Sequence, residues 1–405
     1  MFLLLSMNVA WGATYYQDVR PILDRHCANC HRPQGIAPMA FATYAQARPW
    51  AKAIGQAVAT RKMPPWFAEP EFARHFSNDP SLSAEELSTI ASWVREGAPE
   101  GRPVAASVKE ATPWSIGTPD AVFAMPRPFA IPSKGEIEYQ YVIVPTGFAE
   151  DRWVQKVEVA PGNRRAVHHA VVYVREPGSK WLRESPVGVP FAVSGENPDS
   201  FTTSDLLHTY TPGNPTDQWP DGMAKLIPAG SDLVLQLHYT AGGGTDRTRV
   251  GVVFARSAPQ ERVMTLQLGN DHFVIPPGVP GHRVQAWGTL PNAARLVGLF
   301  PHMHLRGDRF EYRVTPPGGR ALTLLRVSGY DFQWQLNYRL AEPLNLPAGT
   351  LVEVTGTFDN SKLNPRNPDP GEAVRFGFQS REEMMIGFFD VAVPANVDKE
   401  KFFLR

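Results

Sequence analysis

Leu233-Val234-Leu235-Gln236-Leu237-His238-Tyr239 places a large apolar side chain at every second position. Residues two apart share one face of a strand, so this run predicts a β-strand with one buried face. Residues 139–144 and 153–159 have the same character, and turns rich in glycine and proline separate such runs. Many short strands at this spacing predict antiparallel β-sandwiches.

The strand-like region is too long for one simple sandwich. It begins near residue 114 and runs to residue 405. We therefore expect two all-β, antiparallel, jelly-roll-like sandwiches, over residues 114–268 and 269–405. The 39 prolines and 33 glycines of the chain also favour short strands and turns over long helices.

Charge and hydropathy exclude several classes of partner. Lys plus Arg and Asp plus Glu each number 40, so no net charge favours nucleic acid or anionic lipid. No run approaches the ~20 apolar residues of a membrane span. We expect no nucleic-acid partner and no membrane span.

The first residues predict export. Residues 1–13 combine an apolar core with a small-residue end and are interpreted as a signal-peptide remnant; a short buried segment is the alternative. Export places the protein in a bacterial periplasm. A loose stretch of proline, glycine, alanine and serine at residues 101–113 is interpreted as a linker.

Residues 14–100 carry helix signals. Val19, Ile22 and Leu23 form an apolar stripe. Ser83 and Glu86 form a predicted capping box in front of a second helical pattern, and Gly97 is expected to end that helix.

The motif Cys27-Ala28-Asn29-Cys30-His31 lies directly after the first helical stripe. Its cysteines have the spacing that forms thioethers to haem, and the histidine that follows them serves as an axial ligand. A zinc half-site would need further cysteine or histidine ligands, and the chain has only 2 cysteines. The motif predicts one covalent c-type haem.

Two methionines compete for the sixth position on the haem iron. Met63 precedes two prolines, which make its loop stiff, and Met39 also follows a proline. Small cytochrome c domains place their methionine in such a Met-Pro-Pro loop, and this segment resembles them over about 85 residues. The resemblance implies a small all-α cytochrome c domain over residues 14–100, with Met63 as ligand.

Five histidines cluster in three short segments after the linker. Because strand residues two apart share a face, His302 and His304 can bind one metal. His168 and His169 are adjacent and would point to opposite faces, so they can share a metal only at a strand end or a bulge. His238 lies in the run quoted first. A single strand histidine is usually packed or exposed; five in such settings predict metal sites.

The order His-His, Gln-x-His-Tyr, His-x-His and Glu-Met, ending at Glu383-Met384, resembles the copper type II, ascorbate-dependent monooxygenases. These include the peptidylglycine alpha-hydroxylating and dopamine beta-monooxygenases. Residues 358–370 are also similar, and the resemblance covers about residues 115–405. It implies two copper ions. The electron-transfer copper would be bound by His168, His169 and His238, and the oxygen-binding copper by His302, His304 and Met384.

Ligand chemistry agrees with copper. Imidazole supports both copper oxidation states, and a thioether favours Cu(I). Zinc is bound by cysteine, histidine and carboxylate ligands rather than by thioethers. Met385 is expected in the core, on the opposite face from Met384. The remaining histidines that match no ligand position are interpreted as structural: His75, His208, His272 and His282.

The sequence departs from the peptide-hydroxylating members at three positions. Phe300 stands where they have an arginine that binds the substrate carboxylate, and Ile386 and Phe388 stand where they have an asparagine and a tyrosine. An apolar surface cannot repay the desolvation of a carboxylate. We expect a small substrate that is uncharged or apolar.

The resemblance and the haem motif together imply a periplasmic copper monooxygenase. It would hydroxylate a C–H bond of a small molecule with O2, and an external donor would supply electrons through the haem. The alternatives are a non-catalytic haem and copper protein for electron transfer or copper binding, and an oxidase that reduces O2 without inserting it.

Overall fold

The computed structural model describes residues 12–28, 30–33, 35–72, 75–103, 114–193 and 206–402. Two compact units divide the chain. A helical unit comprises residues 1–66 and 80–109, and a β unit comprises residues 67–79 and 110–405. Most of the predicted signal-peptide remnant, residues 1–11, and most of the predicted linker, from residue 104, lie outside the described residues.

Short helices make up the regular structure of the helical unit. Its described elements are η1 (Tyr15–Val19), α1 (Arg20–His26), α2 (Tyr44–Ala47), η2 (Arg48–Trp50), α3 (Ala51–Ala59) and α4 (Ala84–Arg95). Val19, Ile22 and Leu23 lie in one apolar core with Ile90 and Trp93 of α4. The predicted stripe is therefore buried, as its spacing indicates.

The predicted capping box of α4 is confirmed. The Glu86 N–H donates to Ser83 Oγ at 3.1 Å, and the Ser83 N–H donates to Glu86 Oε2 at 2.8 Å. Gly97, at φ 83°, follows the helix end. That left-handed conformation suits glycine and lets the chain turn away from the helix.

The expectation of a small all-α cytochrome c domain over residues 14–100 is wrong. The helices of this stretch are short, with α2 at 4 residues and α4, the longest, at 12. Strands dominate the fold as a whole. Residues 67–79 moreover belong to the β unit, where Ala68 bridges Val327 and Phe76 bridges Leu340. Stripes and caps identify single helices, and they did not reveal that the middle of this stretch pairs with strands far along the chain.

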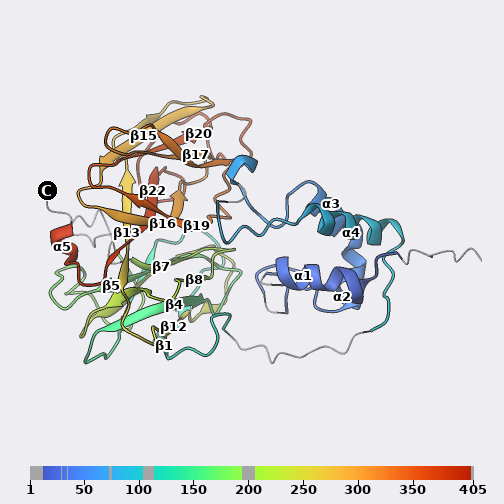
Figure 1. The fold of residues 1–405 in the computed structure, drawn as a ribbon, viewed down its shortest axis with the longest axis horizontal. Coiled ribbons are helices and arrows are strands. Elements are labelled where there is room, and N and C mark those ends of the chain that lie inside the picture. Colours follow the sequence, from blue (N-terminus) through green and yellow to red (C-terminus); the bar gives the residue numbers. More distant parts are fainter. Residues whose placement is uncertain are drawn as a thin grey trace, which may run out of the picture. The chain divides into compact units, whose positions relative to one another are not determined.

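The β unit holds the strands and two short helices (Figure 1). Its helices are η3 (Pro70–Phe72) and α5 (Lys399–Phe402). The strands up to the expected boundary are β1 (Ala121–Ala124), β2 (Phe129–Ala130), β3 (Gln140–Pro145), β4 (Arg152–Ala160), β5 (Val167–Arg175), β6 (Phe191–Ala192), β7 (Leu206–Tyr210), β8 (Thr216–Gln218), β9 (Met223–Ile227), β10 (Asp232–Tyr239), β11 (Thr245–Asp246), β12 (Arg249–Phe254) and β13 (Glu261–Gly269). The later strands are β14 (Val274–Ile275), β15 (His282–Thr289), β16 (Ala294–His302), β17 (Gly307–Thr315), β18 (Leu322–Ser328), β19 (Tyr338–Leu346), β20 (Leu351–Phe358), β21 (Val374–Arg375) and β22 (Ile386–Pro394).

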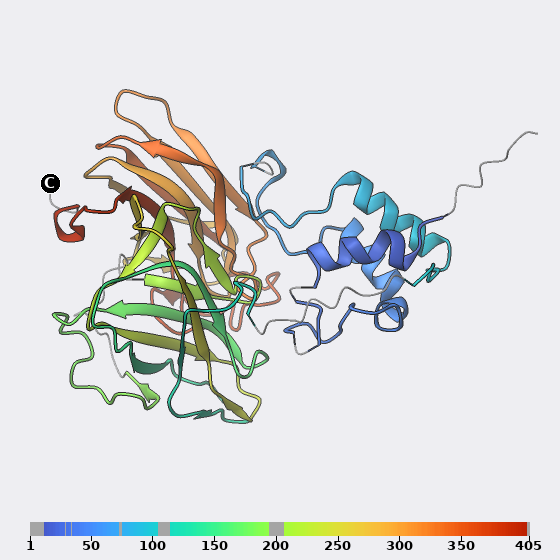
Figure 2. The same cartoon turned by 60° about the horizontal axis from the view of Figure 1, so that its bottom comes forward.

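Three larger sheets form the layers, which Figure 2 shows from a second direction. A 9-stranded sheet has the order β1-β12-β4-β9-β13-β22-β16-β19, with β8 on β4. A 5-stranded sheet has the order β6-β3-β10-β5-β7, and a 4-stranded sheet the order β15-β20-β17-β18. Sandwich architecture therefore fits the β unit, but its two halves share the longest sheet, because β13 pairs with both β9 and β22.

The first core lies between the 5-stranded sheet and the β1–β13 part of the longest sheet. Leu233, Leu235, Leu237 and Tyr239 all belong to it, as the alternation in the opening run predicts. His238 points to the other face of β10. No helix among the described residues is both long and apolar enough to cross a membrane.

Candidate metal centres

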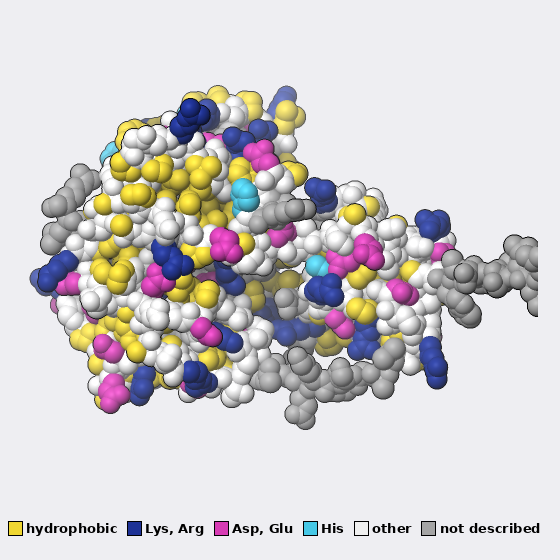
Figure 3. All heavy atoms as spheres, in the orientation of Figure 1, with side chains coloured by type: hydrophobic (Ala, Val, Ile, Leu, Met, Phe, Trp, Pro, Cys, Tyr) yellow, Lys and Arg dark blue, Asp and Glu magenta, His cyan; other side chains and the backbone are white. Residues whose placement is uncertain are grey.

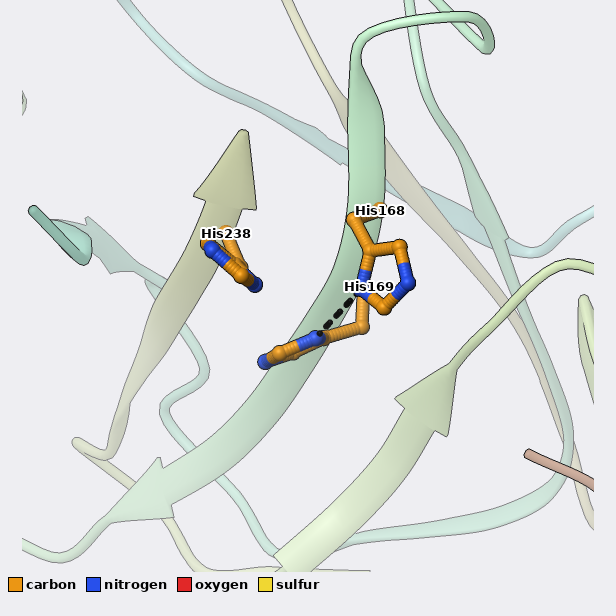
Figure 4. A group of neighbouring side chains, drawn as sticks. All are labelled: His168, His169 and His238. Carbon is orange, nitrogen blue, oxygen red and sulfur yellow. Dashed lines mark hydrogen bonds between the residues drawn. The ribbon is translucent and has the colours of Figure 1, made fainter. Parts of the chain in front are cut away.

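His168, His169 and His238 form the first candidate centre (Figure 4). Each offers a ring nitrogen, and these atoms all lie within 4.8 Å of one another. His168 and His169 come from β5 and His238 from the neighbouring β10. The structure thus brings together the three histidines that the sequence assigned to one metal.

A β-bulge makes this arrangement possible. His238 pairs with His169, but the next residue, Tyr239, pairs with Val167, so His168 has no partner in the register. The extra residue turns the strand locally and places both histidines on one side. Their Nδ1 atoms are 3.2 Å apart. This is the bulge that the adjacent histidines required.

Aromatic rings enclose the first centre. The Tyr139 ring lies 4.8 Å from His238 and 5.5 Å from His169, between ring centroids.

Burial, followed by the neighbouring His238, lowers the pKa of His168 to about 3. Burial also lowers the pKa of His238 to about 4 and that of His169 well below the usual value. All three rings are held neutral, which is the state that binds a metal.

His302 and His304 form the second candidate centre at the end of β16. Their ring centroids are 5.2 Å apart. His302 Nδ1 faces Gln335 Oε1 at 2.7 Å, and His304 Nδ1 faces the Glu382 carbonyl at 3.1 Å. Both acceptors fix the proton on Nδ1 and leave Nε2 with a lone pair. His304 Nε2 is buried and has no hydrogen-bond partner among the described residues.

Met384 lies just before β22, which begins at Ile386. β16 and β22 pair up to His302 opposite Ile386. His304 lies two residues after His302, and Met384 lies two residues before Ile386, so both follow directly on this strand pair. Met384 is buried, at 8 % exposed. Met385 is fully buried, as expected for the opposite face.

A buried carboxylate supports the second centre, and the sequence reasoning did not single it out. Glu383 is 0 % exposed, and its two oxygens accept the N–H groups of His304 at 2.8 Å and Arg306 at 2.6 Å. Arg306 donates through Nε to Asn360 Oδ1 at 2.8 Å. The Glu-Met and Asp-Asn-Ser motifs contain this support, so their similarity to the copper family was a usable signal.

The loop between β18 and β19 supplies further residues that no motif marked. Gln335 orients His302, as described above. The Tyr330 hydroxyl accepts the Met303 N–H at 3.0 Å and donates to the Met303 carbonyl at 2.8 Å. It thereby fixes the residue between the two histidines.

An apolar surface lies beside the second centre. Phe300 pairs with Phe388 across β16 and β22, two residues from the His302–Ile386 pair, so all four share a face. The Phe388 ring centroid lies 6.4 Å from His302 and 6.0 Å from Phe300. The three positions that depart from the peptide-hydroxylating enzymes therefore line one patch.

The CxxCH motif lies at the end of α1. The Cys30 and His31 N–H groups both donate to the Cys27 carbonyl, at 3.1 and 2.8 Å. His31 Nδ1 faces the Met39 carbonyl at 3.1 Å, and Phe41 stacks on the ring at 4.3 Å between centroids. His31 Nε2 is thus the nitrogen available to a metal.

Other polar residues lie outside these centres. His208 is fully buried and donates through Nδ1 to Asp217 at 2.6 Å, whereas His272 is exposed. On the face shown in Figure 3, cationic and anionic side chains are interspersed. That face offers no single-sign patch to a charged polymer.

Comparison with known proteins assigns no family. No family model matches the chain, and no curated protein matches it. Solved structures that it is similar to include the infectious bursal disease virus VP2 subviral particle, at 12 % identity and TM-score 0.20 over 70 % of this chain and 73 % of that one. A second is the major capsid protein P2 of bacteriophage PM2, at 9 % identity and TM-score 0.24, over 57 % of this chain and 98 % of that one. A third is PNGF-II, at 10 % identity and TM-score 0.23, over 67 % of this chain and 60 % of that one. TM-scores this low give no information about function.

Proposed function

We propose that this chain is a copper-dependent monooxygenase. It hydroxylates a C–H bond of a small, uncharged or apolar molecule with O2, and it receives electrons through a covalent haem. The observation that carries this proposal is the pair of histidine groups in the β unit. Burial lowers the pKa of all five rings, and His168, His238 and His304 each keep a buried ring nitrogen with no hydrogen-bond partner among the described residues.

The donor sets favour copper over zinc. Three neutral imidazoles meet at the first centre, and the second would combine the imidazoles of His302 and His304 with the thioether of Met384, which lies just before the strand that pairs with β16. A thioether favours Cu(I) and adds little to a zinc site. When bound, copper supplies one-electron redox chemistry at both centres and reactivity toward O2 at the second.

The protein contributes orientation and exclusion of water. Gln335 and the Glu382 carbonyl fix the tautomers of His302 and His304, so both present Nε2. Glu383 holds the backbone around His304, so the ligand cannot swing out to solvent. Burial of these groups keeps bulk water from the reacting carbon, which protects against side reactions.

The apolar patch argues for the substrate class. Phe300, Ile386 and Phe388 provide no group that could compensate a carboxylate or an ammonium group removed from water. They can bury an alkyl or aromatic part of a substrate beside His302. A small molecule with an accessible C–H bond suits this surface better than a charged peptide end.

Cys27, Cys30 and His31 would hold the haem, which would supply the electron inlet. His31 Nδ1 is engaged by a carbonyl, which leaves Nε2 for the iron. Haem of this kind is attached outside the cytoplasm, in agreement with the signal-like first residues. The external partner is then a periplasmic electron donor.

Metal analysis of purified protein tests the proposal. We expect two copper ions and one covalently bound iron per chain, by mass spectrometry of the metals and by haem staining of the denatured chain. The haem stain should disappear in Cys27→Ala. Zinc in place of copper would contradict the proposal, and two coppers without hydroxylated product in the presence of O2 would favour a copper-binding or electron-transfer protein.

Replacement of Met63 should remove the sixth haem ligand. Met39 presents its carbonyl to the Nδ1 edge of His31, which is opposite to the edge that faces iron, and its side chain packs against the helical core. We therefore expect Met63→Ala to abolish the thioether-to-iron absorption band and lower the reduction potential, because a methionine ligand raises it. Met39→Leu is the matched control; loss of the band in that variant would reverse the assignment.

A further inference from the structure

One aromatic ring contacts both histidine centres. Phe332 stacks on His168 of the first centre, with ring centroids 4.4 Å apart and planes inclined by 25°. The same ring meets His304 of the second centre edge-on, at 5.7 Å and 78°. Phe332 is buried, at 4 % exposed. A single side chain therefore lies between a ligand of each centre.

The loop that carries Phe332 is tied to the second centre at two further points. Tyr330 binds both backbone groups of Met303, and Gln335 binds His302. Because Tyr330 and Gln335 flank Phe332, the ring cannot shift without disturbing the histidines of the second centre. Residues 329–337 are called the Phe332 loop below.

Residues 67–79 hold both ends of the Phe332 loop. At the first end, the Ser328 N–H donates to the Phe67 carbonyl at 3.0 Å, and Ser328 Oγ donates to Glu69 at 2.6 Å. At the second end, Asn78 Nδ2 donates to the Asn337 carbonyl at 2.7 Å, and Asn78 Oδ1 accepts the Arg339 N–H at 2.9 Å. Figures 1 and 2 show this blue segment beside the orange strands.

We propose that Phe332 is a positioning residue that fixes the spacing between the two metal centres, and that residues 67–79 hold it in place. The inference rests on the proposed function, since it presumes copper at both centres. Nothing in the ligand motifs requires such a ring, which comes from a loop that contributes no ligand.

The spacing matters because copper at the two centres would supply one-electron redox chemistry. The proposed function needs one electron to be passed from the first centre to the second, which would leave the first oxidised and the second reduced by one unit. No bond forms or breaks at Phe332. An electron that crosses one packed ring has a shorter and better coupled path than one that crosses water, so a fixed ring keeps the transfer rate uniform.

Paramagnetic coupling between the two copper ions tests the inference. Wild-type protein, Phe332→Leu and the control Phe310→Leu are each loaded with copper, and the dipolar broadening of the Cu(II) EPR spectrum is recorded. Phe310 is also buried, in β17, and among the described residues its ring pairs with Tyr312 rather than with a histidine of either centre. We expect Phe332→Leu to spread or shift the copper–copper distance while Phe310→Leu keeps the wild-type spectrum.

The support from residues 67–79 has its own pair of variants. Asn78→Ala removes two hydrogen bonds at the second end of the loop and should change the coupling in the same direction as Phe332→Leu, to a smaller extent. Glu71→Ala removes only an exposed ion pair with Arg326 and should leave the coupling unchanged.

Copper content separates this inference from the proposed function. If the wild type binds fewer than two coppers, the proposed function fails. If all variants bind two coppers and Phe332→Leu has the wild-type spectrum, Phe332 does not set the spacing and the inference alone is overturned.

Discussion

Replacement of His304 with alanine should weaken copper binding at the second centre by more than about 100-fold, because loss of an outer-sphere partner alone costs about 10- to 100-fold. His304 presents a buried Nε2 and has its Nδ1 held by the Glu382 carbonyl, so its ring is already oriented for a metal. Its removal leaves two of three ligands. Copper titration against a competing chelator measures the change, and the bound copper should fall from two ions to one.

His272→Ala is the matched control for this variant. Its ring is exposed and contacts only Asp271, so copper binding should be unaffected. Haem content should also be the same in both variants, since the CxxCH motif is unchanged. Two tightly bound coppers in His304→Ala would show that His304 is not a ligand and would remove the main support for the second centre.

Local patterns in the sequence predicted the strands, and the resemblance to the copper monooxygenases implied how the histidines are grouped. The alternation of residues 233–239 gave the buried face of β10, and the same period placed His238 on the opposite face of the sheet, beside His168 and His169 of the neighbouring β5. Adjacent His168 and His169 implied a bulge, and the register contains one. The strand faces and the bulge depend on neighbours in sequence or on one strand pair, so periodicity is enough to find them.

Contacts between distant segments could not be predicted in this way. Phe332 and Gln335 lie in a loop that contains no ligand motif, and only the folded chain shows them beside His168 and His302. Residues 67–79 follow a helical stretch in sequence, yet they pair with β18 and β19. The expected all-α domain failed for the same reason, because helix signals report local structure and say nothing of a distant partner.

Asp217→Asn should destabilise the β unit by about 3–5 kcal/mol, the usual cost of breaking a buried ionic network by removing one partner. Asp217 is 6 % exposed and lies on β8. Its oxygens accept from His208 Nδ1 at 2.6 Å, Arg339 Nη2 at 2.8 Å and Asn337 Nδ2 at 3.0 Å. An asparagine would turn an amide N–H₂ toward one of these donors, so a donor would lose its acceptor. Urea unfolding at pH 7 measures the loss, and exposed Asp221→Asn, expected within about 0.5 kcal/mol of wild type, is the control.

The pH dependence of stability distinguishes this ionic role from simple packing. Burial by itself would raise the pKa of Asp217, but His208 and Arg339 hold that pKa well below its usual 3.8. Near and below pH 4 the unfolded state therefore binds more protons than the folded state. The contribution of Asp217 to the free energy of unfolding is present above the unfolded pKa and is lost as the pH falls below it. Wild-type protein should lose stability more steeply than Asp217→Asn between about pH 4 and 2. The difference between their free energies of unfolding should therefore become smaller on acidification. If that difference stays constant over this pH range, Asp217 stabilises the fold through its shape alone and not through its charge. Asn337 is the last residue of the Phe332 loop and Arg339 lies at the start of β19, so the same variant should also alter the copper–copper coupling. The stability of this network and the geometry of the two centres would then change together.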